Sequence, residues 1–271
     1  MNIGAIKLSH FSVKEYLLSE HVQEYFGIDE KTSHSKMSQL SITYLLQFSD
    51  SSLPLTEAML DSMPLAQYAA EYWIDHAKSG RMDPIILQLI LHLFISGSAP
   101  LQNWIQMHNI DAEHIWILDF EPFFHYKNLL MDGAEVCSAL YYSSLAGMQE
   151  VPDCLLHKGE NANAEGGRLG NALQAASCKG YEAIVKSLLE NGAEVNAKGG
   201  EFGNALQAAS FKGNEVIVKL VLENGAEVNA KGGVYGNALQ AAAASYQGNV
   251  AVVKLLLENG AEVNAKEGDY G

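Results

Sequence analysis

The histidines are the first residues to test for chemistry, because spaced pairs of histidines hold catalytic metals in many enzymes. The chain has nine of them, but no His-Glu-x-x-His motif occurs. His108, His114 and His125 are separated by 6 and 11 residues, with no accompanying cysteine. Structural histidines are therefore favoured over a metal site, and we expect no metal.

Motifs for nucleophilic catalysis or phosphate binding are also missing from the sequence. Cys137, Cys154 and Cys178 are odd in number and match no disulfide or metal spacing, which favours free thiols. Cys178 has no histidine after it to act as a base, since the last one is His157. Neither Gly-x-Ser-x-Gly nor Gly-x-x-x-x-Gly-Lys-Ser/Thr occurs, and the Gly-Gly steps suit turns better than phosphate binding. We predict no enzyme activity and no cofactor.

Net charge limits the partners that this chain can have. The 271 residues include 17 basic and 32 acidic side chains, a formal charge of −15, shared as −9 in residues 1–133 and −6 in residues 134–271. Nucleic acid and anionic membranes are thus disfavoured, and a basic protein surface is weakly favoured. No signal peptide opens the chain, and the longest apolar run, Ile85–Ile95, is too short to span a bilayer. We expect a cytoplasmic protein.

An internal repeat organises the second half of the chain. The seven residues Gly203–Ala209 recur 33 residues earlier and 33 residues later. A second phrase, Asn-Gly-Ala-Glu-Val-Asn-Ala-Lys, starts at Asn191, Asn224 and Asn259, with spacings of 33 and 35. A period of this length predicts stacked supersecondary units that share one continuous core.

Each unit is predicted to be a pair of helices followed by a hairpin. Asn204 suits an N-cap, Ala-Leu-Gln-Ala-Ala favours a first helix, and Gly213 suits its left-handed end. The second helix carries a stripe of apolar residues at helical spacing, and a Gly-rich link then reverses the chain. The stripe in this unit consists of Ile217, Val218, Val221 and Leu222.

The period, the helix pair and the Gly-Ala-Glu-Val-Asn-Ala phrase resemble the ankyrin repeat, which implies an all-α solenoid with short hairpins. One departure stands out, because the family's usual Thr-Pro-Leu-His opening reads Asn-Ala-Leu-Gln at Asn204–Gln207. The cap and the apolar Leu are kept, while the helix-starting Pro and the hydrogen-bonding His are replaced. The variant Gly-Gly-x-x-Gly-Asn-Ala-Leu-Gln-Ala-Ala is similar to ankyrin arrays of fungal NACHT-type receptors.

Segments of the first half extend this resemblance. Leu8–Ser19 resembles the end of the winged helix that follows the nucleotide-binding domain in such receptors, and Met63–Trp73 and Asn103–Ile105 resemble the helical connector after it. The resemblance implies the C-terminal part of a fungal NACHT-ankyrin receptor of the NLR-like kind. It also implies that His10 corresponds to a nucleotide-sensing histidine, although the chain has no P-loop to serve it.

These patterns predict three parts and their helices. We expect a partial winged-helix and helical segment over 1–80, a connector over 81–133 and ankyrin repeats over 134–271. Within the first of these parts we expect a loop at Asp29–Lys36 and a helix at Met37–Phe48. The apolar stripe of the last second helix would be covered by a fifth repeat that only begins here, so we expect either weak protection of the fourth repeat or self-association through it. The repeats are predicted at about 137–166, 167–199, 200–232 and 233–267.

Comparison of the repeats indicates where a partner would bind. The repeated sequence motifs hardly vary between repeats, whereas the residues at the hairpin tips and at the ends of the first helices do. We therefore expect exposed aromatic residues at the tips that contact a protein. The predicted function is a protein–protein interaction module, the ligand-sensing arm of an intracellular receptor. Alternatives are a fragment of a nucleotide-dependent STAND-type switch and a purely structural scaffold. The predicted partner-binding residues are Arg168, Leu169, Glu201, Phe202, Phe211, Val234, Tyr235 and Tyr246.

Overall fold

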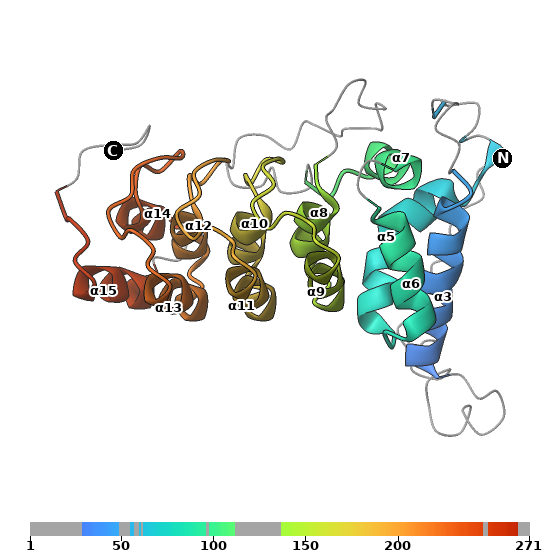
Figure 1. Cartoon of the computed structure of the whole chain (residues 1–271), viewed down its shortest axis with the longest axis horizontal. Helices are drawn as coiled ribbons and strands as arrows, with labels where there is room; N and C mark the ends of the chain where they lie inside the picture. The colour runs from blue at the N-terminus through green and yellow to red at the C-terminus, as the bar shows by residue number, and fades with distance from the viewer. Residues whose placement is uncertain are drawn as a thin grey trace, which may run out of the picture.

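The computed structural model describes residues 29–48, 55–56, 60, 62–95, 98–111, 137–245 and 249–264. It is elongated, with a group of helices at one end and a regular array of helix pairs leading away from it (Figure 1). In the described residues the only β-structure is two isolated bridges, at Glu165–Asn171 and Gly199–Gly203. The predicted all-α repeat solenoid is therefore confirmed.

Four helices form the group that precedes the array. Helix α3 packs on α5 and α6, and α5 packs on α7. Helix α3 begins seven residues earlier than expected, so the predicted loop at Asp29–Lys36 is wrong. The Asp29 carboxylate accepts a hydrogen bond from the Thr32 backbone N–H, which caps the helix and offsets the polar composition of its first turns. The helices are α3 (Glu30–Leu45), α5 (Ala66–Ser79), α6 (Pro84–Leu93) and α7 (Ala99–Met107).

Aromatic packing holds this group together and joins it to the array. The rings of Trp73 and Trp104 are edge-on with centroids 5.2 Å apart, and Phe94 lies 5.4 Å from Trp104. The Trp104 indole N–H donates to the Ala70 carbonyl at 3.0 Å, which satisfies its one polar atom in the core. Tyr142, in the first repeat, lies 6.4 Å from Trp104, and the core continues from this group into the repeats.

The array stacks four helix pairs in two rows (Figure 1). First helices α8, α10, α12 and α14 lie beside the hairpins, and second helices α9, α11, α13 and α15 form the opposite row. In chain order they are α8 (Ala139–Ala146), α9 (Glu150–His157), α10 (Ala172–Lys179), α11 (Glu182–Glu190), α12 (Ala205–Lys212), α13 (Glu215–Glu223), α14 (Ala238–Ala244) and α15 (Val250–Glu258).

The predicted helix caps are present. Asn171, Asn204 and Asn237 each accept a hydrogen bond from the backbone N–H three residues on, at 2.8–2.9 Å. Gly180 and Gly213 end α10 and α12 with φ of 83° and 72°, a conformation that disfavours residues with a Cβ. In the irregular first repeat, α9 accommodates its proline within the first turn, where no intrahelical N–H is lost.

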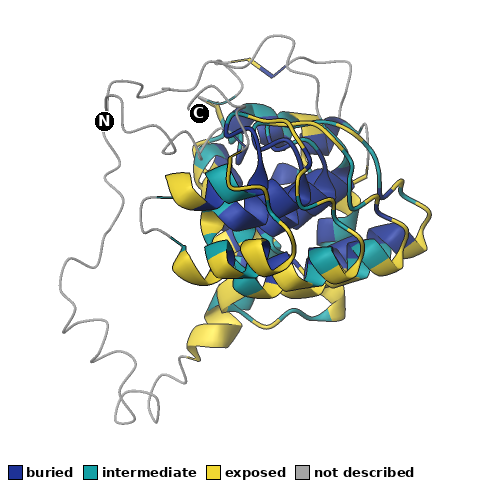
Figure 2. Cartoon of the chain, turned by 90° about the vertical axis from the view of Figure 1, so that its left-hand side faces the viewer, coloured by how far each residue is buried: buried dark blue, intermediate teal, exposed yellow. Residues whose placement is uncertain are grey.

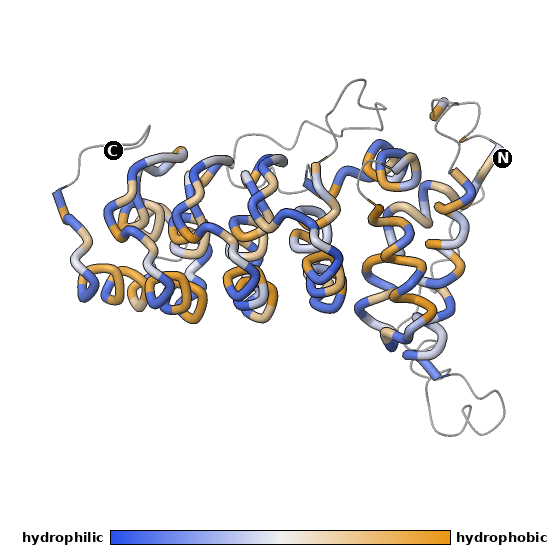
Figure 3. Tube along the Cα trace, viewed as in Figure 1, coloured by the Kyte–Doolittle hydropathy of each residue, from blue (hydrophilic) through white to orange (hydrophobic). Residues whose placement is uncertain are grey.

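Small residues on the first helices and larger ones on the second build the core of the stack. Figure 2 shows this buried interior along the length of the array. Ala175 and Ala208 are fully buried, and so are Leu188 and Val221 in the second row. Leu222 is half-buried, so the predicted stripe is one position wider than the buried face. Each fully buried Leu or Val contributes about 1.5–3 kcal/mol relative to exposure. Hydrophobic positions dominate α13 and α15 in Figure 3.

Candidate partner-binding surface

The hairpins project from the array in a row, and paired glycines let successive hairpins touch. Each hairpin is closed by a backbone hydrogen bond such as the one from the Gly199 N–H to the Gly203 carbonyl at 2.9 Å. Gly200 has φ of 63°, and a Cβ there would lie 2.2 Å from the Leu169 carbonyl carbon of the preceding hairpin. Gly233 stands in the same relation to Phe202. The Gly-Gly steps therefore serve close packing between hairpins.

Hydrogen bonds then join the hairpins into one ladder. The Glu201 N–H donates to the Arg168 carbonyl and the Val234 N–H to the Glu201 carbonyl, both at 2.9 Å. From below, the Gln207 side-chain amide donates to the carbonyls of Gly232 and Gly236, at 2.8 and 3.1 Å. Gln174 makes the equivalent bonds one repeat earlier. Glutamine thus supplies side-chain hydrogen bonds between repeats at the position where the sequence lacks the expected histidine.

The ladder starts outside the repeats, at Asp111. One Asp111 carboxylate oxygen accepts from the Arg168 N–H at 2.7 Å, and the other accepts from the Tyr141 hydroxyl at 2.6 Å. That hydroxyl in turn accepts from the Leu169 N–H at 3.2 Å. The carboxylate therefore fills the place that a preceding hairpin's carbonyl would take. Nothing in the sequence indicated this role, because Asp111 belongs to no motif.

The predicted exposed tip aromatics are buried instead. Leu169, Phe202 and Tyr235 are only 2%, 1% and 8% exposed, so the expectation that they project into solvent is wrong. The Phe211 ring at the end of α12 stacks on Tyr235 at 4.7 Å and lies 5.3 Å from Phe202. The reason is that the first helices present small alanines, and the tip side chains fold back to fill the space above them.

The partly accessible residues of the tips are those that alternate with the buried ones. Arg168, Glu201 and Val234 occupy equivalent positions of three successive hairpins and are half-buried, as is Phe211. The Arg168 guanidinium and the Glu201 carboxylate are 2.7 Å apart, with side chains 29% and 17% exposed. Glu201, predicted as a partner-binding residue, is therefore paired with Arg168 within the chain. Two further predicted site residues, Tyr246 and His10, lie outside the described residues.

Little in this part of the molecule is arranged for catalysis. Burial raises the pKa of the Cys178 thiol and of the Cys137 thiol, which keeps both protonated and weakly nucleophilic near neutral pH. In the described ranges no three His, Cys, Asp or Glu side chains converge as metal ligands. The described helices also include none long and apolar enough to cross a membrane.

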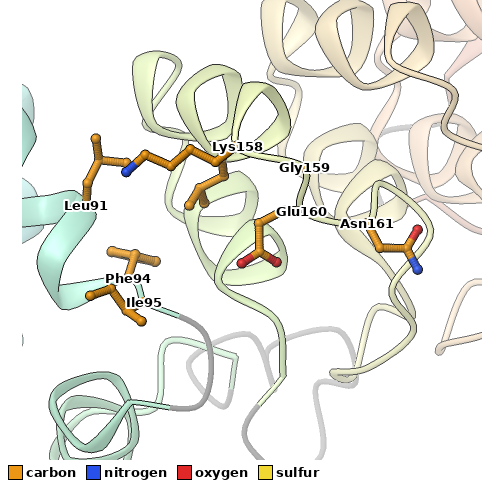
Figure 4. A pocket seen from close by; sticks show the side chains of 8 residues that line it. Leu91, Phe94, Ile95, Lys158, Gly159, Glu160 and Asn161 are labelled. Atoms are coloured by element: carbon orange, nitrogen blue, oxygen red, sulfur yellow. The ribbon is translucent and has the colours of Figure 1, made fainter.

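A cavity of about 390 Å³ lies where α6 meets the first repeat. Its walls combine Leu91 of α6, the two apolar residues that follow this helix, and Leu155 of α9 with the polar loop after α9 (Figure 4). Lys158 and Glu160 are the titratable residues of its lining, which includes no Ser, Cys or His. The lining residues are Leu91, Phe94, Ile95, Leu155, Lys158, Gly159, Glu160 and Asn161.

Comparisons with known proteins agree with this architecture. The family model described as ankyrin repeats in three copies matches residues 198–267, and the model for ankyrin repeats in many copies matches residues 172–222. The chain is also 34% identical over 160 residues to the Monascus ruber protein named "Azaphilone pigments biosynthesis cluster protein L". That match covers 56% of this chain and 32% of the relative, so the chain spans about a third of the relative's length. The repeats over 172–267 are ankyrin repeats.

Proposed function

Since its regular repeats are ankyrin repeats, we propose that this chain recognises a protein partner through the hairpin tips and the adjoining ends of the first helices. The residues that would make contact are the partly accessible ones, Arg168, Glu201, Val234 and Phe211. The buried tip residues would act indirectly, because Phe202 and Tyr235 fix the height and direction of the tips that carry the contacts.

One observation carries this proposal, namely that the tips are fixed relative to one another before any partner binds. Backbone bonds connect Arg168 to Glu201 and Glu201 to Val234, and side-chain amides support the hairpins from below. A row of side chains held in this way loses little conformational entropy on binding, which favours affinity. The predicted alternative of a purely structural scaffold does not require such a row to remain accessible.

We further propose that the recognition module is the ligand-sensing arm of an intracellular, cytoplasmic receptor of the fungal NLR-like kind. The support is the resemblance of Leu8–Ser19 and Met63–Trp73 to the segments that precede ankyrin arrays in such receptors. A relative about three times longer than the shared region fits an arm attached to other domains. The relative's printed name describes a biosynthesis cluster and states no activity that could be transferred.

Affinity capture tests the recognition role. The whole chain, immobilised, should enrich at least one protein from an extract of its source organism. The variant Arg168→Ala with Val234→Arg changes two tips, and the variant Lys254→Ala changes an exposed residue of α15 as the matched control. We expect the control to retain the captured protein and the tip variant to lose most of it. Equal capture by both variants would contradict binding through the tips.

A titration with ATP or GTP tests the switch alternative. The chain lacks a P-loop, so calorimetry at micromolar protein should show no saturable binding. Saturable binding that disappears in His10→Ala would support a nucleotide-dependent switch instead and would give His10 its predicted sensing role.

A further inference from the structure

The charges of the array are divided between its two edges. We define the hairpin edge as the hairpins 164–170, 197–203 and 230–236 with helices α8, α10, α12 and α14, and the outer edge as the second helices with the loops after them. Among the described residues, the outer edge has four basic and eleven acidic side chains, a formal charge of −7. The hairpin edge has only Glu165 and Glu201 as acids against five bases, a formal charge of +3. The bases are Arg168, Lys179, Lys198, Lys212 and Lys231.

Three of these bases belong to the second and third repeats, whose first helices α10 and α12 pack side by side. Lys179 and Lys212 are the last residues of α10 and α12, in equivalent positions 33 residues apart. Together with Arg168, both lie close enough to Cys178 to act electrostatically on its thiol. Helices α10 and α12 contain no acidic residue, and the nearby Glu201 carboxylate is paired with Arg168. This cluster is therefore locally positive in a chain of charge −15.

Arg168 is paired with Glu201 across two neighbouring tips, and two lysines of the outer edge are paired within their own helices. Lys186 pairs with Glu190, and Lys219 pairs with Glu215, each one helical turn away on the same helix. Their charge is compensated locally, as on an ordinary solvated helix face. At the hairpin edge, Lys212 lies 5.4 Å from the centroid of the half-buried Phe211 ring, so charge and apolar surface are presented together.

The equivalent positions in the neighbouring repeats carry no charge. Ala146 corresponds to Lys179 in the first repeat, and Ser245 corresponds to Lys212 in the last. The positive cluster therefore covers two repeats, the same two whose tips hold Arg168 and Glu201. Its extent suits a short segment of chain better than a large flat surface.

We infer that the hairpin edge of the second and third repeats binds an acidic segment of a protein partner, with Arg168, Lys179 and Lys212 facing its carboxylates and Phe211 an apolar side chain. The inference rests on the proposed recognition role and adds the chemistry of the partner to it. It also reverses the weak expectation of a basic partner drawn from the net charge, because binding depends on the local potential.

Nucleic acid is the less favoured polyanion for this edge. A nucleic-acid backbone carries negative charge along its whole length and would extend beyond the cluster. Its phosphates would then be repelled by the outer edge, which has a formal charge of −7. A protein segment can place a few carboxylates at the cluster and be neutral elsewhere.

Fluorescence anisotropy with the full chain tests the inference. The probe is a fluorescein-labelled peptide of glutamates spaced by glycine and serine around one phenylalanine, and the comparison peptide has lysine in place of glutamate. We expect the glutamate peptide to bind at low salt, to weaken as salt rises, and to bind more tightly than the lysine peptide. No binding of the glutamate peptide, or equal binding of the two peptides, would overturn the inference.

Charge reversal locates the binding. Lys212→Glu is compared with Lys219→Glu, which makes the same change on the outer edge at another exposed lysine. We expect the double variant Lys179→Glu, Lys212→Glu to weaken peptide binding roughly tenfold, the single Lys212→Glu less, and Lys219→Glu to leave it within about twofold. Equal losses in Lys212→Glu and Lys219→Glu would show a diffuse charge effect and would overturn the site.

The same assay separates this inference from the proposed function. An oligothymidylate that binds as tightly as the glutamate peptide, with the same variant dependence, would overturn the preference for a protein segment. If the tip variants abolish capture of a protein while the glutamate peptide fails to bind, the recognition role stands and its acidic chemistry is wrong. If the peptide binds at Lys212 while the tip variant captures the protein as well as the control does, the acidic site stands and the tip-based recognition role is wrong.

Discussion

The Asp111 carboxylate accepts a hydrogen bond from the Tyr141 hydroxyl at 2.6 Å, and this contact joins the helices before the array to its first repeat. Both side chains are buried, and burial together with the Asp111 charge raises the pKa of Tyr141, so the hydroxyl remains a donor at every physiological pH. The second carboxylate oxygen holds the Arg168 N–H. Through this pair, a residue outside the repeats completes the hairpin ladder.

The first prediction concerns this pair. Asp111→Ala should lower the free energy of unfolding by about 1–3 kcal/mol or more, because it leaves the Arg168 N–H and the Tyr141 hydroxyl without their buried acceptor. Tyr141→Phe should cost about 1 kcal/mol, and the double variant less than the two single losses added. Chemical denaturation measures all three. Strict additivity would show that the two residues do not act together.

The second prediction concerns the glutamine between repeats. Gln207→Glu places a carboxylate against the carbonyls of Gly232 and Gly236, in place of the amide that donates to them. We expect a loss of about 1–3 kcal/mol at pH 7.5 that shrinks as the pH falls, since a protonated acid can donate again. Gln240→Glu, at the half-buried equivalent position in the last repeat, serves as control and should cost less. Equal losses would mean that burial at this position has no effect.

The third prediction compares two leucines of the second row. Leu188→Ala removes a fully buried side chain and should cost about 2–5 kcal/mol, because the stack closes only partly over the cavity. Leu257→Ala removes a side chain that is 42% exposed and should cost less than about 1 kcal/mol. Denaturation curves for both variants provide the measurement. A larger loss for Leu257 would show that the outer face of α15 is covered in solution.

The fourth prediction concerns that same outer face. Leu257 is 42% and Val263 is 73% exposed, whereas their counterparts Leu222 and Val228 are half-buried beneath the next repeat. We expect amides of residues 250–260 to exchange hydrogen faster than those of residues 215–224. If this difference vanishes at high protein concentration, the face is covered by a second copy of the chain. Uniform protection at all concentrations would contradict both outcomes.

The fifth prediction concerns a histidine pair between α3 and α5. His76 lies with its Nδ1 2.8 Å from Nδ1 of His34 and its Nε2 2.8 Å from the Tyr68 hydroxyl. Burial and the charge of His34 lower the pKa of His76, while Asp75 opposes them. The unfolded chain therefore binds a proton more readily, so stability from His76 is present above about pH 6.5 and is lost as the pH falls below it.

The variant His76→Gln checks this sign. Urea denaturation at pH 7.5 and pH 5.0 should show a larger loss of stability in the original chain than in the variant, which has no group to titrate at this position. A variant that loses as much stability on acidification as the original chain would place the pH dependence elsewhere, in other residues of the fold.

The sequence by itself determined the local elements of the array. The 33-residue period, the asparagine caps and the second-helix stripe depend on interactions within a few residues, so Asn204, Gly213 and Val221 could be placed correctly from their neighbours in the chain. Local interactions also account for α6, which has Pro84 in its first turn and Asp83 as its cap. It failed at Asp29–Lys36, where one N-cap hydrogen bond outweighs a polar composition.

Only the tertiary structure decided which tip residues are accessible and what begins the ladder. Phe202 and Tyr235 look exposed in a turn sequence, but the hairpin folds over the alanines of the first helices and the rings fill that space. Asp111 and Tyr141 are 30 residues apart and meet only when the helices before the array dock on it. Contacts of this kind depend on how separate elements pack, which no local pattern of residues encodes.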